Sequence, residues 1–304
     1  MKIGLTSYSL NADLSAGRKT ILDAMKFAKE QGAEHFEIVP SSYCVFYDDG
    51  KHEFNEELIK SVRELSDELS LPLSNYAIGA DLVSGDDNRR AAEVERLKHH
   101  VEAAAKLGMH SLRHDITFMC PPASDAPNVF EKLLPTAAEC TREITDYAKT
   151  LGINTLVENH GFFFNGSDRM IRLFNAVGSD NFGILLDCGN FICVEEDPLV
   201  AVKKCIGIAK MVHLKDFYIR RLDGGFSAPE LYAGRGPWFM SVNGEFMLRG
   251  SIVSQGDLDI PHTIEALKKS GYDGYVSIEF EGMEDCSAAS AAGMNAAKYL
   301  LGRV

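Results

Sequence analysis

Short apolar runs alternate with longer amphipathic segments along most of the chain. Eight runs of four to six residues have the apolar, β-rich character of buried strands. They are Lys2–Thr6, His35–Val39, Pro72–Ala77, His110–Arg113, Asn154–Glu158, Phe182–Asp187, Lys210–His213 and Gly274–Glu279. Between them, apolar residues recur at helical spacing over Lys19–Gln31, Glu56–Leu69, Arg89–Leu107, Phe130–Leu151, Asp168–Val177, Leu199–Ile208, Ile260–Lys269 and Cys286–Leu301.

This alternation predicts a parallel α/β fold. Eight strands that alternate with eight helices favour a closed (β/α)8 barrel, the TIM-barrel architecture, over an open doubly wound sheet. Gly32, Gly108, Gly152 and Gly271 directly follow four of the helical segments, as expected for C-terminal caps. No break in composition and no repeat divides the chain, so residues 1–304 are expected to form a single domain.

One connection is unusually long. The segment from Asp216 to Gly256, after the seventh strand, has no helical period and is expected to be a long loop. Loops at the carboxyl ends of barrel strands carry most active-site residues, so the segment is interpreted as a lid over the catalytic face. The alternative is a surface insertion without a role.

Four polar side chains end four consecutive strands of the predicted barrel. Glu158, Asp187, His213 and Glu279 end the fifth to the eighth strand, and strand ends meet at one mouth of a barrel. A single acid there is often a helix cap or an ion-pair partner, but four in register are hard to obtain by chance. Mixed carboxylate and imidazole ligation suits one divalent ion, namely Mn²⁺, Mg²⁺, Co²⁺ or Zn²⁺.

Composition limits the partners and the cellular compartment that are expected for this protein. The net charge of −13 argues against nucleic acid or an anionic membrane as a partner. The seven cysteines are odd in number and form no C-x-x-C, which favours reduced thiols in a cytoplasmic protein. The start of the chain has no apolar run long enough for a signal peptide, and no segment of the sequence is apolar enough to span a membrane.

Four segments resemble the sugar phosphate isomerase/epimerase family, the xylose-isomerase-like barrels. They are VENHG (157–161), LLDCGN (185–190), MVHLKD (211–216) and GDLDIPHTIEALKKSGYDGYVSIEFEG (256–282), and the first 150 residues add little that is diagnostic. The resemblance implies a divalent metal held by Glu158, Asp187, His213 and Glu279. It also implies that Glu158 and Glu279 form the acid/base pair of an isomerase or epimerase.

That chemistry suits the residues. A divalent ion that binds two neighbouring oxygens of a hydroxy-ketone stabilises an enediolate, while carboxylates remove and return a proton. The expected substrate is a ketose, a keto-polyol or one of their phosphates. Two positions depart from the ketose 3-epimerases: Asn190 stands where they tend to have His, and Ile219 where they tend to have Arg. A particular ketohexose is therefore not indicated.

Five further residues are candidates for substrate binding. Arg113 ends the fourth strand, His160 follows the fifth, and Lys215 lies two residues past His213, on the same side of its strand. Each has a structural alternative, as an ion-pair partner or an ordinary loop residue. Asn190 can hydrogen-bond a hydroxyl. Trp238 could stack on a sugar or be buried as lid core, whereas His99 and His100 are expected to face solvent on a helix.

Other functions use related sites. A metal-dependent dehydratase of a cyclic polyol, of the inosose type, needs the same enolate and then expels a hydroxyl group. Apurinic-endonuclease-like phosphodiesterases share the barrel, but they need more histidines than this chain offers, and the negative charge opposes DNA binding. A non-catalytic sugar-binding barrel is expected to have lost one of the four metal ligands, whereas all four are present in this sequence. A homo-oligomer is compatible with the sequence, since such barrels often form dimers or tetramers.

Overall fold

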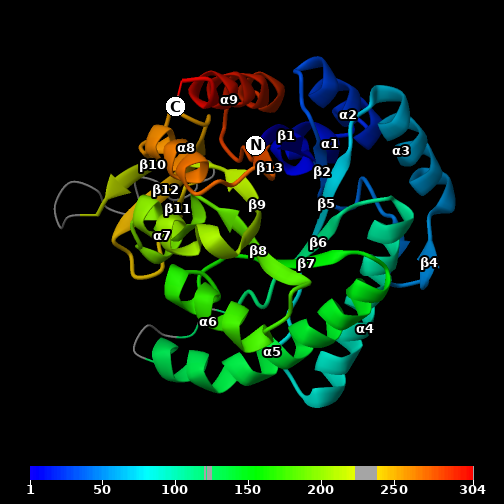
Figure 1. Ribbon diagram of the computed structural model, residues 1–304, viewed down its shortest axis with the longest axis vertical. Coiled ribbons are helices and arrows are strands. Elements are labelled where there is room, and N and C mark those ends of the chain that lie inside the picture. Colours follow the sequence, from blue (N-terminus) through cyan, green and yellow to red (C-terminus); the bar gives the residue numbers. More distant parts are fainter. Residues whose placement is uncertain (120, 122–124, 223–237, 304) are drawn as a thin grey trace.

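The computed structural model describes residues 1–119, 121, 125–222 and 238–303. Within them, parallel strands close into a barrel in the order β1-β13-β9-β8-β7-β6-β5-β2 (Figure 1). The strands are β1 (Lys2–Thr6), β2 (Phe36–Ile38), β5 (Leu73–Ile78), β6 (Ser111–His114), β7 (Asn154–Glu158), β8 (Phe182–Asp187), β9 (Ala209–Leu214) and β13 (Tyr275–Ile278). The predicted TIM barrel is therefore confirmed, and each expected strand end lies within one residue of the observed one.

Helices form the outer layer around these strands (Figure 1). They are α2 (Ile21–Glu30), α3 (Glu56–Leu69), α4 (Asp87–Lys106), α5 (Ala126–Thr150), α6 (Ser167–Val177), α7 (Pro198–Cys205), α8 (Ile260–Lys269) and α9 (Cys286–Leu301), with the short α1 (Asn11–Ser15). The 3-10 turns η1 (Ser7–Leu10), η2 (Asn190–Val194) and η3 (Ile206–Ile208) complete the helical elements of the described residues. Gly32, Gly108, Gly152 and Gly271 have φ angles of 74°, 73°, 72° and 78°, which confirms the predicted left-handed caps.

Burial on both faces explains the apolar strands. All six residues of β8 are buried, because their side chains alternate between the barrel interior and the helical layer. Six of the seven cysteines lie in the described residues and all six are free thiols, while Cys120 lies outside those residues. Among the described helices, none combines the length and the apolar character that a bilayer crossing requires.

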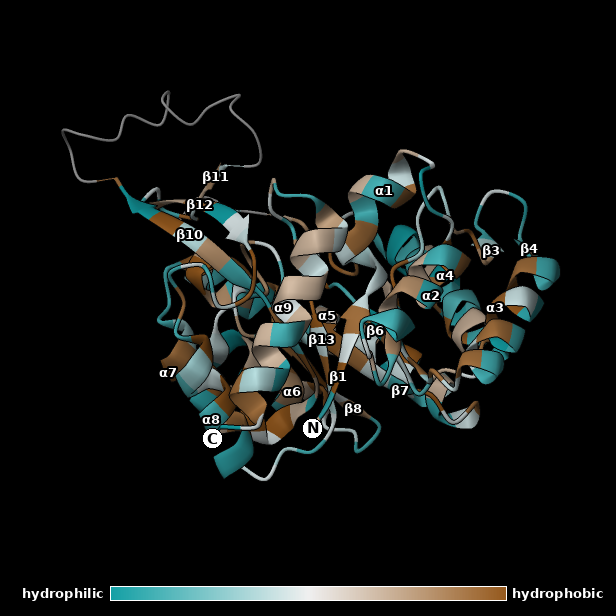
Figure 2. Ribbon diagram, turned by 90° about the horizontal axis from the view of Figure 1, so that it is seen from above, coloured by the Kyte–Doolittle hydropathy of each residue, from teal (hydrophilic) through white to brown (hydrophobic). Residues whose placement is uncertain are grey.

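The connection after β9 is not a plain loop. Its described residues form β10 (Asp216–Arg221), β11 (Phe239–Met240) and β12 (Phe246–Ser251), an antiparallel sheet in the order β10-β12-β11. The prediction of a segment without secondary structure is therefore wrong for these residues, and 223–237 lie outside the described part. The sheet stands at the end of the barrel that also carries α1 (top of Figure 2).

A small apolar cluster fixes this sheet to the barrel. Phe217 and Leu248 pack with Ile192, and Phe162 and Phe239 lie against them. The Asp216 carboxylate accepts backbone N–H groups from Phe217, Gly256 and Leu258, which closes the base of the connection. The sheet is therefore a packed layer beside the carboxyl ends of the barrel strands.

A second addition, the hairpin of β3 (Tyr47–Asp48) and β4 (Glu53–Phe54), covers part of α4. The expectation that His100 faces solvent is wrong, because the hairpin buries it. His100 Nε2 lies 3.2 Å from the Asp49 carboxylate, so this nitrogen carries the proton and Nδ1 accepts from the Tyr76 hydroxyl at 2.9 Å. The pKa of His100 is lowered by burial to about 4, so the imidazole is neutral at pH 7.

The substitution Tyr76→Phe should therefore destabilise the fold. It leaves His100 Nδ1 buried without a donor, which costs about 1–3 kcal/mol in free energy of unfolding. Urea unfolding of the variant measures this loss. Tyr299→Phe is the matched control, because Tyr299 is 59% exposed on α9. Equal stability of the two variants would contradict the role assigned to the Tyr76 hydroxyl.

Candidate metal centre

The four predicted strand-end residues converge at the carboxyl end of the barrel. Glu158 ends β7, Asp187 ends β8, His213 lies in β9 and Glu279 directly follows β13. Asp187 pairs in register with His213 across β8 and β9. One ligand atom from each of the four residues lies within 4.8 Å of the other three, and all four residues are buried. This arrangement could hold a single cation.

His213 is oriented by a carboxylate that the sequence analysis did not consider. Its Nε2 lies 2.7 Å from Oε2 of Glu37 in β2, and its Nδ1 is 3.3 Å from Oε2 of Glu279. Glu37 also accepts a hydrogen bond from Asn75 at 2.8 Å and is fully buried. Its one signal in the sequence is an acidic residue in the middle of the apolar strand Phe36–Ile38.

Charge keeps this pair ionised in the described structure. Burial opposes a charge on His213, but the neighbouring Glu37 and Glu279 carboxylates outweigh burial and raise the pKa of His213 well above its ordinary value. Burial also acts to raise the pKa of Glu37, yet the His213 charge and hydrogen bond hold that pKa below its usual range. A metal on Nδ1 would leave the Nε2–H bonded to Glu37, as in carboxylate–histidine–metal arrangements.

Asp187 is held with one oxygen unsatisfied. Its Oδ1 accepts the backbone N–H groups of Gly189 at 2.7 Å and of Asn190 at 2.9 Å. Asn159 bonds both the backbone N–H and the backbone carbonyl of Asp187, at 2.8 and 2.9 Å. Among the described residues, no hydrogen bond reaches the buried Oδ2, which has an ion-pair contact with Lys215 Nζ at 3.4 Å. A carboxylate oxygen without a hydrogen bond, among two other carboxylates and an imidazole, belongs to the donor set expected for a divalent ion, so the residues fit one.

The two glutamates differ in environment. Glu158 Oε1 accepts a hydrogen bond from Asn190 at 2.9 Å, and Oε2 forms an ion pair with Arg113 Nε at 2.7 Å. Burial raises the pKa of Glu158 above its ordinary value, and the charge of Arg113 opposes this only in part. Burial acts in the same direction on Glu279, but the charges of Lys215 and His213 hold its pKa well below the usual range. Carboxylates with diverging pKa values can take different roles in proton transfer.

Lys215 reaches the same centre, on the side of its strand that was predicted. Its Nζ lies 2.8 Å from Glu279, 3.4 Å from Asp187 and 3.5 Å from Glu281, and it donates to Asn190 Oδ1 at 3.2 Å. The lysine therefore pairs with acids, and the three acids in these ion pairs are Asp187, Glu279 and Glu281. Its pKa is raised well above the ordinary value, because these carboxylates outweigh burial.

Arg113 and His160 share one buried acid, Asp115. Arg113 lies 2.9 Å and His160 Nδ1 3.0 Å from Asp115 Oδ1. Burial acts to lower the pKa of His160, but Asp115 outweighs it and raises that pKa. Arg113, Asn190 and Lys215 thus contact residues of the four-residue cluster directly, and His160 is joined to Arg113 through Asp115. Their role in binding substrate stays a prediction.

The aromatic candidate, Trp238, lies next to the small sheet. The ring of Trp238 packs against the guanidinium groups of Arg249 and Arg220, at 5.7 and 6.0 Å, in the small sheet. Phe162 and Phe239 belong to the apolar cluster beneath that sheet, and their rings meet edge to face at 6.3 Å. Packing therefore accounts for these two phenylalanines, while stacking of Trp238 on a sugar stays a prediction.

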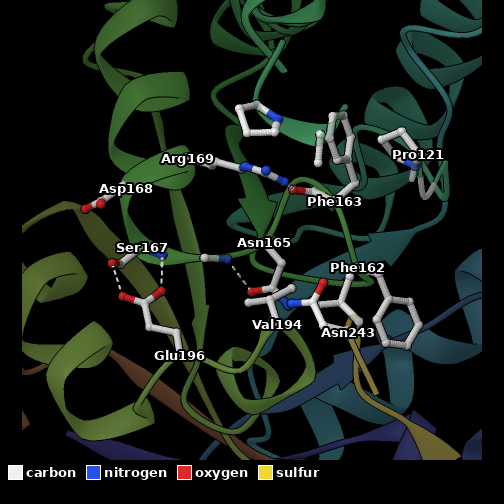
Figure 3. A pocket seen from close by; sticks show the side chains of 14 residues that line it. Pro121, Phe162, Phe163, Asn165, Ser167, Asp168, Arg169, Val194, Glu196 and Asn243 are labelled. Atoms are coloured by element: carbon white, nitrogen blue, oxygen red, sulfur yellow. Dashed lines mark hydrogen bonds between the residues drawn. The ribbon is translucent and has the colours of Figure 1, made fainter. Parts of the chain in front are cut away.

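The loop after β7 lines one side of a separate pocket of about 340 Å³ (Figure 3). Ser167, at the start of α6, donates its backbone N–H to Glu196 at 2.7 Å, and its hydroxyl also bonds this carboxylate. Asn165 donates to the carbonyls of Gly161 and Asn190, at 2.9 and 2.8 Å. None of the four cluster residues lines this cavity. The hydrogen bonds of Asn165 and Ser167 thus connect the loop that carries His160 to the segment after β8.

A family model for the xylose isomerase-like TIM barrel matches residues 25–300. The chain belongs to this family. Two solved structures share the fold over their whole length: the IolI protein with a bound zinc atom (TM-score 0.72, 16% identical, 100% of this chain and 99% of that one) and D-allulose 3-epimerase from Methylomonas sp. (TM-score 0.70, 16%, 99% and 98%).

Curated relatives match less of the chain. An inosose dehydratase from Lacticaseibacillus casei is 25% identical over 159 residues, which are 52% of this chain and 50% of that protein. The chain thus spans about half the length of the curated relatives it matches first. The family and the fold are established by these comparisons, and the reaction has to be argued from the site.

Loss of the Glu37 charge should weaken metal binding. In Glu37→Gln the buried His213 loses its anionic partner, and changes of this kind lower metal affinity about 10–100-fold. Calorimetric titration of the metal-free protein with Mn²⁺ or Zn²⁺ measures the effect. Glu265→Gln on α8, paired with Lys269 at the surface, is the control. Unchanged affinity in a folded Glu37→Gln protein would contradict the orienting role.

Proposed function

We propose that this chain is a divalent-metal-dependent isomerase or epimerase of a ketose, a keto-polyol or one of their phosphates. The observation that carries the proposal is the convergence of Glu158, Asp187, His213 and Glu279 at the carboxyl ends of β7, β8, β9 and β13. Active sites of such barrels lie at this end, and the donor set suits a divalent ion. These four residues would hold the metal.

When bound, the metal would polarise the substrate carbonyl and stabilise the negative charge of an enediolate. Glu158 and Glu279 are the proposed acid/base pair. They come from β7 and β13, with β8 and β9 between them, so they approach the centre from two sides. One carboxylate removes the proton next to the carbonyl, and a carboxylate returns it to the same carbon in an epimerase or to the neighbouring carbon in an isomerase.

The remaining site residues would orient the substrate. Asn190 contacts both Glu158 and Lys215, so its amide can hydrogen-bond a substrate hydroxyl that lies between these two residues. Arg113 keeps Glu158 in place through its ion pair, and the His160 side chain is 37% exposed, so it would be available to a substrate. Trp238, on the small sheet beside the mouth, would cover the bound substrate.

A second candidate is a dehydratase. The match to inosose dehydratases favours it, since half of the chain resembles proteins of that name. The reaction would begin with the same proton removal and would then expel a hydroxyl group as water. A cytoplasmic location, suggested by the free thiols, and assembly into a homo-oligomer are further expectations that accompany either reaction.

Replacement of either glutamate should abolish proton exchange. In Glu158→Gln and Glu279→Gln the amide cannot accept the substrate proton, so we expect a loss of at least about a hundredfold, within the range for acid/base residues. The measurement is deuterium incorporation from D₂O, followed by NMR with Mn²⁺ and a panel of ketoses, inososes and their phosphates. Glu265→Gln should behave like the parent protein. Full activity in both glutamine variants would remove these residues from the mechanism.

The same spectra distinguish the candidate reactions. Deuterium at carbon 3 of a ketose indicates an epimerase, and formation of an aldose indicates an isomerase. Loss of water from an inosose indicates a dehydratase. Absence of exchange with every compound, in protein loaded with metal, would contradict the proposed function as a whole.

A further inference from the structure

The positive groups at the centre are already paired among the described residues. Lys215 is surrounded by Asp187, Glu279 and Glu281, with the three nitrogen–oxygen distances between 2.8 and 3.5 Å. Arg113 is held between Glu158 and Asp115, at 2.7 and 2.9 Å. An anion that entered this site would have to compete with buried carboxylates for each cation.

The acids also outnumber the bases. Six carboxylates form one network with the two fixed cations, Arg113 and Lys215, in which His213 and Asn190 supply the connecting contacts. The carboxylates belong to Glu37, Asp115, Glu158, Asp187, Glu279 and Glu281. Arg113, Lys215 and one divalent ion would together balance four of these six negative charges.

Glu281 is the carboxylate of this network that lies nearest to solvent. Its side chain is 23% exposed, against 9% or less for Glu158, Asp187 and Glu279. The small sheet holds it in place: a Cβ atom at Gly250 of β12 would lie 2.7 Å from the Cγ and the backbone carbon of Glu281. β12 therefore presses on Glu281 at a position where only glycine leaves room.

We infer that the site selects an uncharged polyhydroxylated substrate and rejects phosphorylated or carboxylated ones, with Glu281 as the residue that sets this preference. Glu281 supplies a third carboxylate to Lys215, so the lysine is not left to bind an anionic group of the substrate. Like charges placed side by side in an interface are strongly unfavourable. The chain's net charge of −13 acts in the same direction on approaching anions. This inference rests on the proposed function and narrows its substrate class.

Binding of unreactive polyols tests the inference without turnover. Calorimetry on the Mn²⁺-loaded protein would compare D-sorbitol, D-sorbitol 6-phosphate and the uncharged dimethyl ester of that phosphate. We expect the phosphate to bind at least about tenfold more weakly than sorbitol, and the dimethyl ester to bind more tightly than the phosphate. Equal or tighter binding of the phosphate would overturn the inference. Binding of the neutral ester that is as weak as binding of the phosphate would also overturn it, because it would indicate exclusion by size. Absence of binding by all three ligands would overturn it as well.

Substitution tests the role of Glu281 itself. Glu281→Gln should reduce the ratio of sorbitol affinity to phosphate affinity at least about threefold, because one carboxylate on Lys215 is lost. Glu265→Gln removes the same charge from the outer surface and should leave the ratio unchanged. An unchanged ratio in folded Glu281→Gln would overturn the assignment to this residue.

Deuterium exchange separates this inference from the proposed reaction. If neutral polyols are preferred but no ketose exchanges its proton, the proposed reaction fails and the charge preference stands. If ketose phosphates exchange with a lower KM than the free ketoses, the charge preference fails and the reaction stands.

Discussion

The arrangement of side chains at the carboxyl end of the barrel depends on buried carboxylates and on the buried positive groups that compensate their charge. Carboxylates at strand ends lose their hydration when the barrel closes, and each ion left uncompensated would cost several kcal/mol. Lys215 lies among three of them, His213 joins Glu37 to Glu279, and Arg113 joins Glu158 to Asp115. Removal of one partner would therefore disturb several others. A bound divalent ion would enter the same balance, so metal binding would be coupled to local stability.

Local patterns predicted most of the barrel and its four cluster residues. Strand Phe182–Asp187 and helix Ile260–Lys269 have the predicted bounds, because each is defined by its own apolar period and flanking caps. Glu37 was missed because its partner His213 is 176 residues away in the sequence. The small sheet was missed for a similar reason, because β10 is completed by antiparallel pairing with β12, which follows much later in the sequence.

Solvent exposure was the least predictable property. His100 lies on a helix whose polar residues face outward, but a hairpin from another connection covers it and supplies Asp49. Conversely, the same barrel is found in an epimerase, and half of the chain resembles inosose dehydratases, while one enediolate can be reprotonated or can lose a hydroxyl group. In the proposed mechanism, the outcome would depend on side chains around the site, such as Asn190 and Glu281, whose neighbours come from loops far apart in the chain.

Asn159 illustrates how a chemical change in one side chain could alter the four-residue cluster. Its side-chain amide bonds both the backbone N–H and the backbone carbonyl of Asp187, and so continues the hydrogen-bonding pattern beyond the end of β7. Hydrolysis of that amide to a carboxylate would replace the donor by an oxygen facing the Asp187 carbonyl, and the two would repel. The geometry of the site would then depend on a residue that is itself none of the four cluster residues.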